Sequence, residues 1–552
     1  MQIWDRVRVW LGNRENLLLL ALIVAHLIPL WAFKYFPSQD GPTHIENASV
    51  ILNYFRSDRT IFREYYLLNK NVEPTWLGHL FLAGLMFIIP TFAVEKVFLS
   101  GYVILLPLSI RYAIRAIRPD SGFLVLLMFP FIYNYPLHMG FYSFSYSLPV
   151  FFFLMGYWMR HGDRFTVRKT VVLAFFSLLL YFCHLVSLVM AYAGIVILTW
   201  WLIWSDVTHD PRVRQFHFRM LWEPFKKRMI PVILALLPTI ILIVIFLYRH
   251  GFESPEIEIR RSFYWLFKDL MQIESLVSFG KEESFCSIGL SVLFAAVFFY
   301  ILVSKIMHRR LNRWDGLLTV VLGYVLIYLF APNAMSEGFF ITDRLNLYPF
   351  FAFVLWFGAQ SYLRSVKGGI MLVAIAITIA SLGLHASKYA ELNDYLAEYL
   401  SGMHLIKPNK TLLPLAFDSR GHAPDGRVLS LKVRPFLHAS GYIAAQRHVV
   451  EFTNYEAGAF NYFPTIFRSD LNPYIHIGIK DRSIVWEPPQ VDFLTYTRRT
   501  GGEVDYVLVW GIQKRQRDLE AAKSIDEQIK KGYKLIYTSP RTELMQLYER
   551  KS

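Results

Sequence analysis

The 552-residue sequence contains little charge and almost no cysteine. Charged residues make up 18% of the chain, against 55% hydrophobic residues, which excludes an ordinary soluble protein. Its two cysteines, Cys183 and Cys286, fall in apolar stretches, so no disulfide framework, CxxC metal site or haem motif is present. Glycine-rich phosphate loops and the GxSxG and HExxH signatures are absent. No basic tract resembles a nucleic-acid-binding arm, so nucleic acid is not an expected partner.

Apolar stretches recur from Asn16 to Ala386 and then stop. At roughly 20 residues per crossing, they predict an α-helical polytopic membrane protein with about 11 to 13 transmembrane helices. Residues 1–386 form the predicted membrane domain, and residues 387–552 form a predicted α/β domain outside the membrane. Four runs in this tail are typical of strands: Arg427–Lys432, Val504–Trp510, Lys534–Tyr537 and Leu544–Tyr548. A charged helix is predicted over Arg515–Lys531.

The net charge of +15 is spread unevenly among the loops that connect the predicted spans. Basic clusters such as Arg111–Arg118 and Arg212–Arg228 alternate with loops of low charge, and the positive-inside rule places the clusters in the cytoplasm. The first outer loop, residues 34–74, and the whole tail then lie outside. One conflict remains, because two full crossings by Thr75–Ile89 and Ala93–Ile110 would put Arg111–Arg118 outside. Either one of the two does not cross, or a further span exists.

The first outer loop carries the motif Asp40-Gly41-Pro42-Thr43-His44. Thr43 and Glu46 have the spacing of a capping box, so a helix is expected to start there and to lie at the membrane interface on its apolar face. Asp40, just before that helix, can accept a proton or orient a cation. The alternative is that Asp40 only caps the helix.

This motif, the short first span, the many later spans and the outer C-terminal domain resemble the GT-C superfamily of membrane glycosyltransferases. Relatives in that superfamily include oligosaccharyltransferase catalytic subunits, protein O-mannosyltransferases and lipid A aminoarabinose transferases. The resemblance implies a polyprenyl-phosphate sugar donor, Asp40 as the catalytic base, and His44 in substrate binding. It also allows a divalent cation, Mg²⁺ or Mn²⁺, at Asp40. The sequence Gln39-Asp40-Gly41 in place of Asp-x-Asp argues against a tightly held ion.

Cations for the donor phosphate are expected in two outer loops. Arg344 stands at the mouth of a late span, where family members often hold the carrier phosphate; the alternative is snorkelling or a pair with Asp343. Arg260, Arg261 and Lys268 flank an aromatic stretch and are the second source, although charges on such a loop are more often simply solvated.

Further candidates are polar groups expected to face the acceptor. His138 and Tyr142 lie in an outer loop between spans, and His438 and Tyr442 lie in the tail. No His or Cys spacing supplies the three or four clustered ligands of a zinc site.

The leading hypothesis is therefore an inverting glycosyltransferase in a bacterial inner membrane, with its active site on the outer face. Its partners would be a polyprenyl-phosphate sugar, membrane lipids and a lipid, glycan or protein acceptor. A transporter or flippase is an alternative, although few ionisable residues lie mid-span and no paired broken helices are seen. A non-catalytic scaffold for envelope assembly is the third possibility.

Overall fold

The computed structural model describes residues 14–208, 217–251, 261–308, 311–335, 338–512 and 516–551. It is mostly helical, with a small sheet region near the C-terminus. The longer helices of the bundle are α2 (Arg14–Ala32), α6 (Thr91–Ile117), α8 (Tyr142–His161), α9 (Val167–Cys183), α10 (Leu185–Thr208), α11 (Trp222–His250), α13 (Glu283–His308), α14 (Gly316–Phe330), α16 (Tyr348–Gly358) and α17 (Arg364–Tyr399). Shorter helices of the same part are α3 (Gly41–Asn53), α4 (Thr60–Tyr65), α5 (Leu77–Met86), α7 (Tyr135–His138), α12 (Phe263–Met271), α15 (Ile341–Leu345) and the 3₁₀ helices η1 (Pro119–Phe131), η2 (Phe218–Leu221), η3 (Glu274–Leu276) and η4 (Arg313–Asp315).

Seven helices within the described ranges are long and apolar enough to cross a membrane. This finding is compatible with a multi-pass membrane protein. Other predicted spans correspond to helices that are not among these seven. They include α9 with 17 residues, α16 with 11 residues and the buried 3₁₀ helix η1.

Helix α5 bears on the conflict in the predicted topology. Its 10 residues extend about 15 Å, half of the roughly 30 Å hydrocarbon thickness, whereas α6 has 27 residues. The basic end of α6 contacts the first turn of α2 through Arg111 and Asn16, and Arg118 donates to the Gln360 carbonyl at 3.1 Å. The cluster Arg111–Arg118 therefore lies at the end of the bundle where α2 and α17 begin, which is where a non-crossing α5 would place it.

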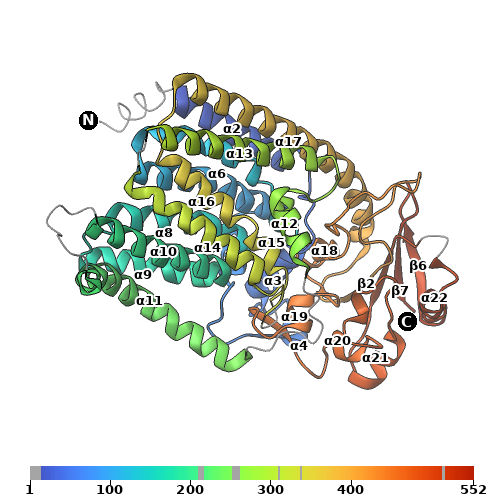
Figure 1. The fold of residues 1–552 in the computed structure, drawn as a ribbon. Coiled ribbons are helices and arrows are strands. Elements are labelled where there is room, and N and C mark those ends of the chain that lie inside the picture. Colours follow the sequence, from blue (N-terminus) through green and yellow to red (C-terminus); the bar gives the residue numbers. More distant parts are fainter. Residues whose placement is uncertain are drawn as a thin grey trace.

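The C-terminal region, residues 400–551, packs on the opposite end of the bundle, where α3, α15, α18 and α19 lie between the two parts (Figure 1). Its elements are η5 (Ser401–Leu405), β2 (Thr411–Ala416), α18 (Ser440–Arg447), β3 (Val450–Glu451), α19 (Tyr455–Ala459), β4 (Thr465–Phe467), α20 (Pro473–His476), η6 (Ser483–Val485), α21 (Phe493–Thr500), β5 (Tyr506–Trp510), α22 (Glu520–Gly532), β6 (Tyr533–Thr538) and β7 (Met545–Arg550).

Five strands form the main sheet in the order β3-β2-β5-β7-β6. β2 is parallel to β3 and β5, whereas β7 is antiparallel to β5 and β6. The predicted strands near Val504, Lys534 and Leu544 correspond to β5, β6 and β7. The predicted strand Arg427–Lys432 is wrong: this segment forms only an isolated bridge between His422 and Val428, and the sheet uses β2 and β3 instead.

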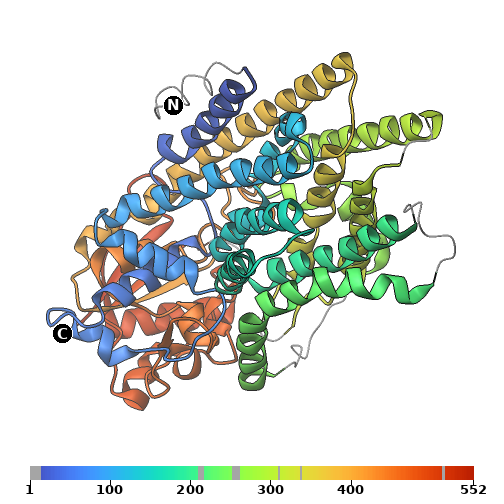
Figure 2. The same ribbon diagram turned by 90° about the vertical axis from the view of Figure 1, so that its left-hand side faces the viewer.

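The C-terminal region is continuous with the bundle. Helix α17 runs unbroken through residues 386 and 387 to Tyr399. The first loop supplies β1 (Tyr66–Leu68), which pairs antiparallel with β4 of the C-terminal region. In Figure 2 the blue N-terminal segments accordingly lie against the orange and red C-terminal part.

The loop before α3 is held by close backbone contacts. The amides of Gln39 and Asp40 donate to the carbonyls of His138 and Met139, both at 3.0 Å. Gly140 has φ of +86°, and a Cβ there would lie 2.4 Å from the amide nitrogen of Gly41. Only glycine fits this approach without strain, so Gly140 sets the position of Asp40.

Replacing Gly140 with alanine tests this packing. Gly140→Ala should lower stability by at least about 1–3 kcal/mol, since the left-handed backbone and the Cβ contact both oppose the side chain. Thermal unfolding of the detergent-purified protein measures the change. The control is Gly383→Ala in α17, where a Cβ would meet no atom within 4 Å and stability should be kept. An unchanged midpoint for Gly140→Ala would contradict the packing argument.

Candidate functional site

A cavity of about 390 Å³ lies where the bundle meets the C-terminal region. Apolar side chains of the cavity wall come from the first turn of α10, the end of α11, the loop before α15 and the C-terminal region, which contributes Phe460 and Phe463. Polar side chains come from α3, α5 and the C-terminal region, and include His44, His79 and Glu456. The cavity therefore suits a molecule with an apolar part and a polar part.

Asp40 lines this cavity and is 5% exposed. It occupies the N-cap position of α3, yet its side chain makes no capping hydrogen bond. The carboxylate accepts instead from Gln39 Nε2 at 3.0 Å, and His438 Nε2 lies 3.9 Å from it. Burial raises the pKa of Asp40 to about 7, against the lowering effect of the Gln39 hydrogen bond. The side chain of Asp40 therefore does not cap helix α3, which was the alternative interpretation.

Helix α3 differs from the prediction in its start and its surroundings. It begins at Gly41, so Thr43 and Glu46 do not form a capping box. Glu46 accepts a hydrogen bond from the Tyr66 hydroxyl at 3.2 Å instead. The helix is buried over Gly41–Val50 between the bundle and the C-terminal region, and does not lie with one face at a membrane surface. Three of its polar residues, His44, Asn47 and Ser49, find partners in the C-terminal region, which explains why the amphipathic interpretation failed.

Arg344 lies on the same cavity and is 8% exposed. Its guanidinium stacks over the Phe141 ring at 4.1 Å and donates to the carbonyl of Phe339, while its Nε has no hydrogen-bond partner. Burial lowers the pKa of Arg344 to about 10, so the group stays cationic at neutral pH. Arg482, over the Phe460 ring at 5.0 Å, is the second arginine among the described lining residues.

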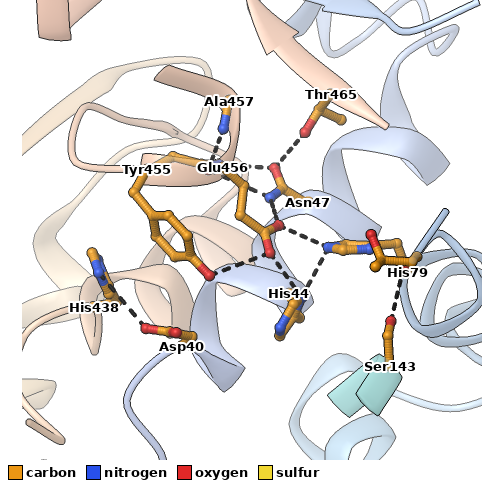
Figure 3. A network of polar contacts seen from close by, with 12 residues as sticks. Asp40, His44, Asn47, His79, Ser143, His438, Tyr455, Glu456, Ala457 and Thr465 are labelled. Carbon is orange, nitrogen blue, oxygen red and sulfur yellow. Dashed lines mark hydrogen bonds and ion pairs between the residues drawn. The ribbon is translucent and has the colours of Figure 1, made fainter. Parts of the chain in front are cut away.

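Three buried side chains converge beside Asp40: His44 of α3, His79 of α5 and Glu456 of α19 (Figure 3). His44 Nδ1 lies 2.9 Å from His79 Nε2 and 3.1 Å from Glu456 Oε1. His79 Nε2 lies 2.7 Å from Glu456 Oε2. All three also line the cavity. Imidazole nitrogens and a carboxylate in this arrangement can hold a metal ion or share protons.

Charge in this trio is centred on the carboxylate. Burial lowers the pKa of His44 to about 4, so its imidazole is neutral at neutral pH. Burial alone would raise the pKa of Glu456, but its contacts with His44, His79 and Asn47 lower that pKa to about 2. Glu456 is therefore an anion held between imidazoles.

An amide network fixes the orientation of Glu456. Asn47 Nδ2 donates to Glu456 Oε2 at 2.6 Å. The Asn47 carbonyl oxygen accepts from Asn454 Nδ2 at 2.8 Å and from Thr465 Oγ1 at 2.6 Å. Because Asn47 Oδ1 already accepts from two donors, the NH₂ group of Asn47 must face Glu456. This fixes the orientation of the Asn47 amide.

Tyr455 connects the trio to Asp40. Its hydroxyl donates to Glu456 Oε1 at 3.4 Å, and its presence near Asp40 lowers the pKa of that carboxyl (Figure 3). Its ring packs against that of His438, with centroids 4.9 Å apart. Burial raises the pKa of the Tyr455 hydroxyl well above its usual value, so it remains protonated and donates.

Five of the predicted candidates line this cavity: Asp40, His44, Tyr142, Arg344 and His438. The Tyr142 hydroxyl is occupied, because it donates to Glu95 Oε1 at 2.5 Å. Tyr442 donates to the other oxygen of Glu95 at 2.7 Å and does not line the cavity, whereas His438 does.

The other predicted site residues lie elsewhere. Arg261 pairs with Asp269 at 3.1 Å and with Asp343 at 3.5 Å. Lys268 lies over the Trp265 ring at 4.8 Å. His138 is buried between Ser278 Oγ and the Tyr389 hydroxyl, at 2.8 and 2.6 Å, where it joins α7 to α17 and to the loop after η3. Arg260 lies outside the described residues.

His79, Glu456 and Arg482 were not among the predicted site residues. His79 falls within the predicted span Thr75–Ile89, where most neighbouring residues are apolar. Glu456 lies 377 positions after His79, so no local spacing could reveal the trio. The absence of a local zinc-binding motif therefore does not extend to ligands that come from three separate helices. A His inside a short apolar segment was the one available signal.

A comparison with protein-family models found no match, and a comparison with curated proteins found no relative.

A buried acid beside the site gives a testable pH dependence. Glu451 is 2% exposed and accepts hydrogen bonds from the Thr453 amide at 3.1 Å and Ser440 Oγ at 3.2 Å. Burial raises the pKa of Glu451 to about 7 from a usual value of 4.5. The folded protein thus keeps a proton that the unfolded chain releases. This group stabilises the fold fully below about pH 4.5, and its contribution is lost as the pH rises through 7.

Glu451→Gln, which mimics the protonated acid, should therefore flatten the loss of stability between pH 5 and 8. The wild type should lose up to about 1.4 kcal/mol per pH unit more than the variant within that window. Thermal unfolding at several pH values measures this difference. The control Glu520→Gln changes an exposed acid of α22 and should leave the wild-type dependence intact. If the stabilities of wild type and Glu451→Gln changed with pH in parallel, the prediction would be wrong, because Glu451 would then be ionised throughout this pH range.

Proposed function

We propose that the protein is a membrane glycosyltransferase that moves a sugar from a polyprenyl-phosphate donor to an acceptor hydroxyl. The observation that carries the proposal is the placement of one buried carboxylate, Asp40, and one buried cation, Arg344, on the same cavity. The likeness of the Asp40–His44 motif to the GT-C superfamily supports the same conclusion. Active site and C-terminal region would then lie on the outer face of a bacterial inner membrane.

The shape of the cavity supports a lipid-linked donor. Apolar residues at the ends of α10 and α11 line it, such as Leu185, Val186, Phe246 and Leu247. A prenyl chain would lie along these residues, and its phosphate would reach Arg344. The unpartnered Nε of Arg344 offers a donor for a phosphate oxygen, and Arg482 offers a second cation.

The chemistry follows from these positions. Asp40 accepts the proton of the acceptor hydroxyl as its oxygen attacks the anomeric carbon. The bond from that carbon to the phosphate oxygen breaks, and its electron pair leaves with the polyprenyl phosphate, whose charge Arg344 stabilises. Attack opposite the leaving group inverts the configuration. A carboxylate with a pKa near 7 is well matched to this proton transfer.

Asp40→Asn tests the base. The amide keeps the shape of the side chain but takes up no proton, so transfer should fall by about 10²-fold or more. Cells lacking the gene and complemented with this variant should accumulate polyprenyl-linked sugar, measured by mass spectrometry of extracted lipids. Glu64→Gln, an exposed acid of α4, is the matched control and should restore the wild-type profile. A wild-type lipid and glycan profile with Asp40→Asn at normal abundance would reject the base and favour a transporter or scaffold.

Arg344→Gln tests the phosphate contact. Loss of a charged hydrogen bond should weaken binding of polyprenyl monophosphate in detergent micelles by roughly 10- to 100-fold, since such bonds contribute about 1.5–3 kcal/mol. Microscale thermophoresis or intrinsic fluorescence can follow the titration. Arg261→Gln serves as the control, because Arg261 pairs with Asp269 and Asp343 away from the cavity wall. Equal weakening by both substitutions would contradict a specific role for Arg344.

A further inference from the structure

His44, His79 and Glu456 form the one group of metal-ligating side chains that converges within the described residues. Their ligand atoms lie within 4.8 Å of one another, and each side chain is buried. We propose that these three residues bind a divalent transition-metal ion, with zinc as the best match, and that the ion keeps an open position toward the cavity. The proposal does not depend on the transferase activity.

The spacing of the three ligand atoms suits a tetrahedral ion. Zn–N and Zn–O bonds of about 2.0–2.1 Å place neighbouring ligand atoms roughly 3.3 Å apart. The observed separations are 2.9 Å between the two nitrogens and 2.7 and 3.1 Å from nitrogen to carboxylate oxygen. Shifts of a few tenths of an ångström would therefore admit the ion.

Proton counting also favours a cation at this point. The 2.9 Å contact between His44 Nδ1 and His79 Nε2 has room for one proton at most, so one nitrogen presents a lone pair. Both nitrogens also face the Glu456 carboxylate, which can only accept when ionised. A metal ion satisfies all of these lone pairs together.

A neighbouring group holds the carboxylate ligand as metal-site partners usually do. Asn47 Nδ2 donates to Glu456 Oε2 at 2.6 Å. Such outer partners set ligand orientation and typically contribute 10- to 100-fold in metal affinity. The ligands come from α3, α5 and α19, so the ion would also join the first loop to the C-terminal region.

Ligand type selects the class of metal. Imidazole nitrogen suits zinc and its neighbours in the first transition row, whereas Mg²⁺ and Ca²⁺ prefer all-oxygen sites. The expected site at Asp40 for Mg²⁺ or Mn²⁺ therefore differs from this one in both position and chemistry. Two histidines and one glutamate leave a fourth position for water or an anionic oxygen, as in catalytic zinc sites. All three ligands line the cavity, so that position is accessible to a bound molecule.

Metal analysis of the full-length protein tests the proposal directly. Detergent-purified wild type is stripped with a chelator, loaded with Zn²⁺ and freed of excess metal by gel filtration. Mass spectrometry of the metal should find about one Zn²⁺ per chain. Co²⁺ in place of Zn²⁺ should give the intense visible absorption of a four-coordinate site. Retention of far less than one ion, or an octahedral Co²⁺ spectrum, would overturn the proposal.

Two ligand variants locate the ion. His79→Gln and Glu456→Gln should each lower Zn²⁺ affinity by more than about 10- to 100-fold. His184→Gln, which alters another histidine of the same cavity wall, should retain the ion. Retention of Zn²⁺ at wild-type affinity by the two ligand variants would show that metal binds elsewhere or that the trio is only a hydrogen-bonded network.

A positioning variant covers the case in which a ligand variant does not fold. Asn47→Ala leaves all three ligands in place but removes the hydrogen bond to Glu456. We expect about 10- to 100-fold weaker Zn²⁺ binding and a shifted Co²⁺ absorption band, which a purely structural role of Asn47 would not produce. Unchanged affinity and an unchanged spectrum would contradict the assigned arrangement.

Discussion

The burial of helix α3 is the constraint on which the site depends. This helix carries His44, Glu46 and Asn47 into a region that excludes water, and each polar group must be paired there to avoid a cost of about 1–3 kcal/mol. The partners come from a part of the chain about 400 residues away: Asn47 contacts Glu456 and Asn454, and Thr465 completes the amide network. The same contacts that satisfy α3 therefore place Glu456 beside His44 and Asp40.

Further contacts join the first outer loop to α17 and to the C-terminal region. β1 of the first loop pairs with β4, Asn393 of α17 hydrogen bonds to the backbone of Tyr35, and the loop at Gly140 holds the backbone of Asp40. Preorganised groups of this kind lose little freedom when a substrate binds. Several buried polar atoms in the cavity wall, including Arg344 Nε and His438 Nδ1, keep unused hydrogen-bonding capacity. Such atoms are the ones on which an incoming ligand gains most.

Much of the helical part could be predicted from sequence, because apolar length and the placement of basic residues are local signals. They located α2, α6 and α17, and they exposed the conflict at Thr75–Ile89 that the short α5 accounts for. The sheet was predicted less well. β5, β6 and β7 have clear apolar patterns, but β2 contains Pro414, and β3 has only two residues, too short for any periodic signal.

The site residues likewise divide into those that local sequence signals reveal and those that depend on packing. Asp40 and Arg344 stand at ends of apolar segments, where charge is conspicuous, and both lie on the cavity. Arg261, Lys268 and His138 looked equally conspicuous, yet local ion pairs, an aromatic ring and buried hydroxyl groups occupy them. His79 and Glu456 could not be paired from sequence, since their contact depends on how α5 and α19 pack and not on spacing.

The order of the strands has a consequence for how the protein is made. β7, the last strand described, lies between β5 and β6, so it is an inner strand of the sheet. A chain emerging from the ribosome can complete its helical bundle while this place is still open, because residues 545–550 are synthesised long afterwards. During that interval β5 presents unpaired backbone groups along one edge, which is the kind of surface that recruits a foreign strand or a chaperone. Closure of the sheet by β7 can therefore follow completion of the helical bundle.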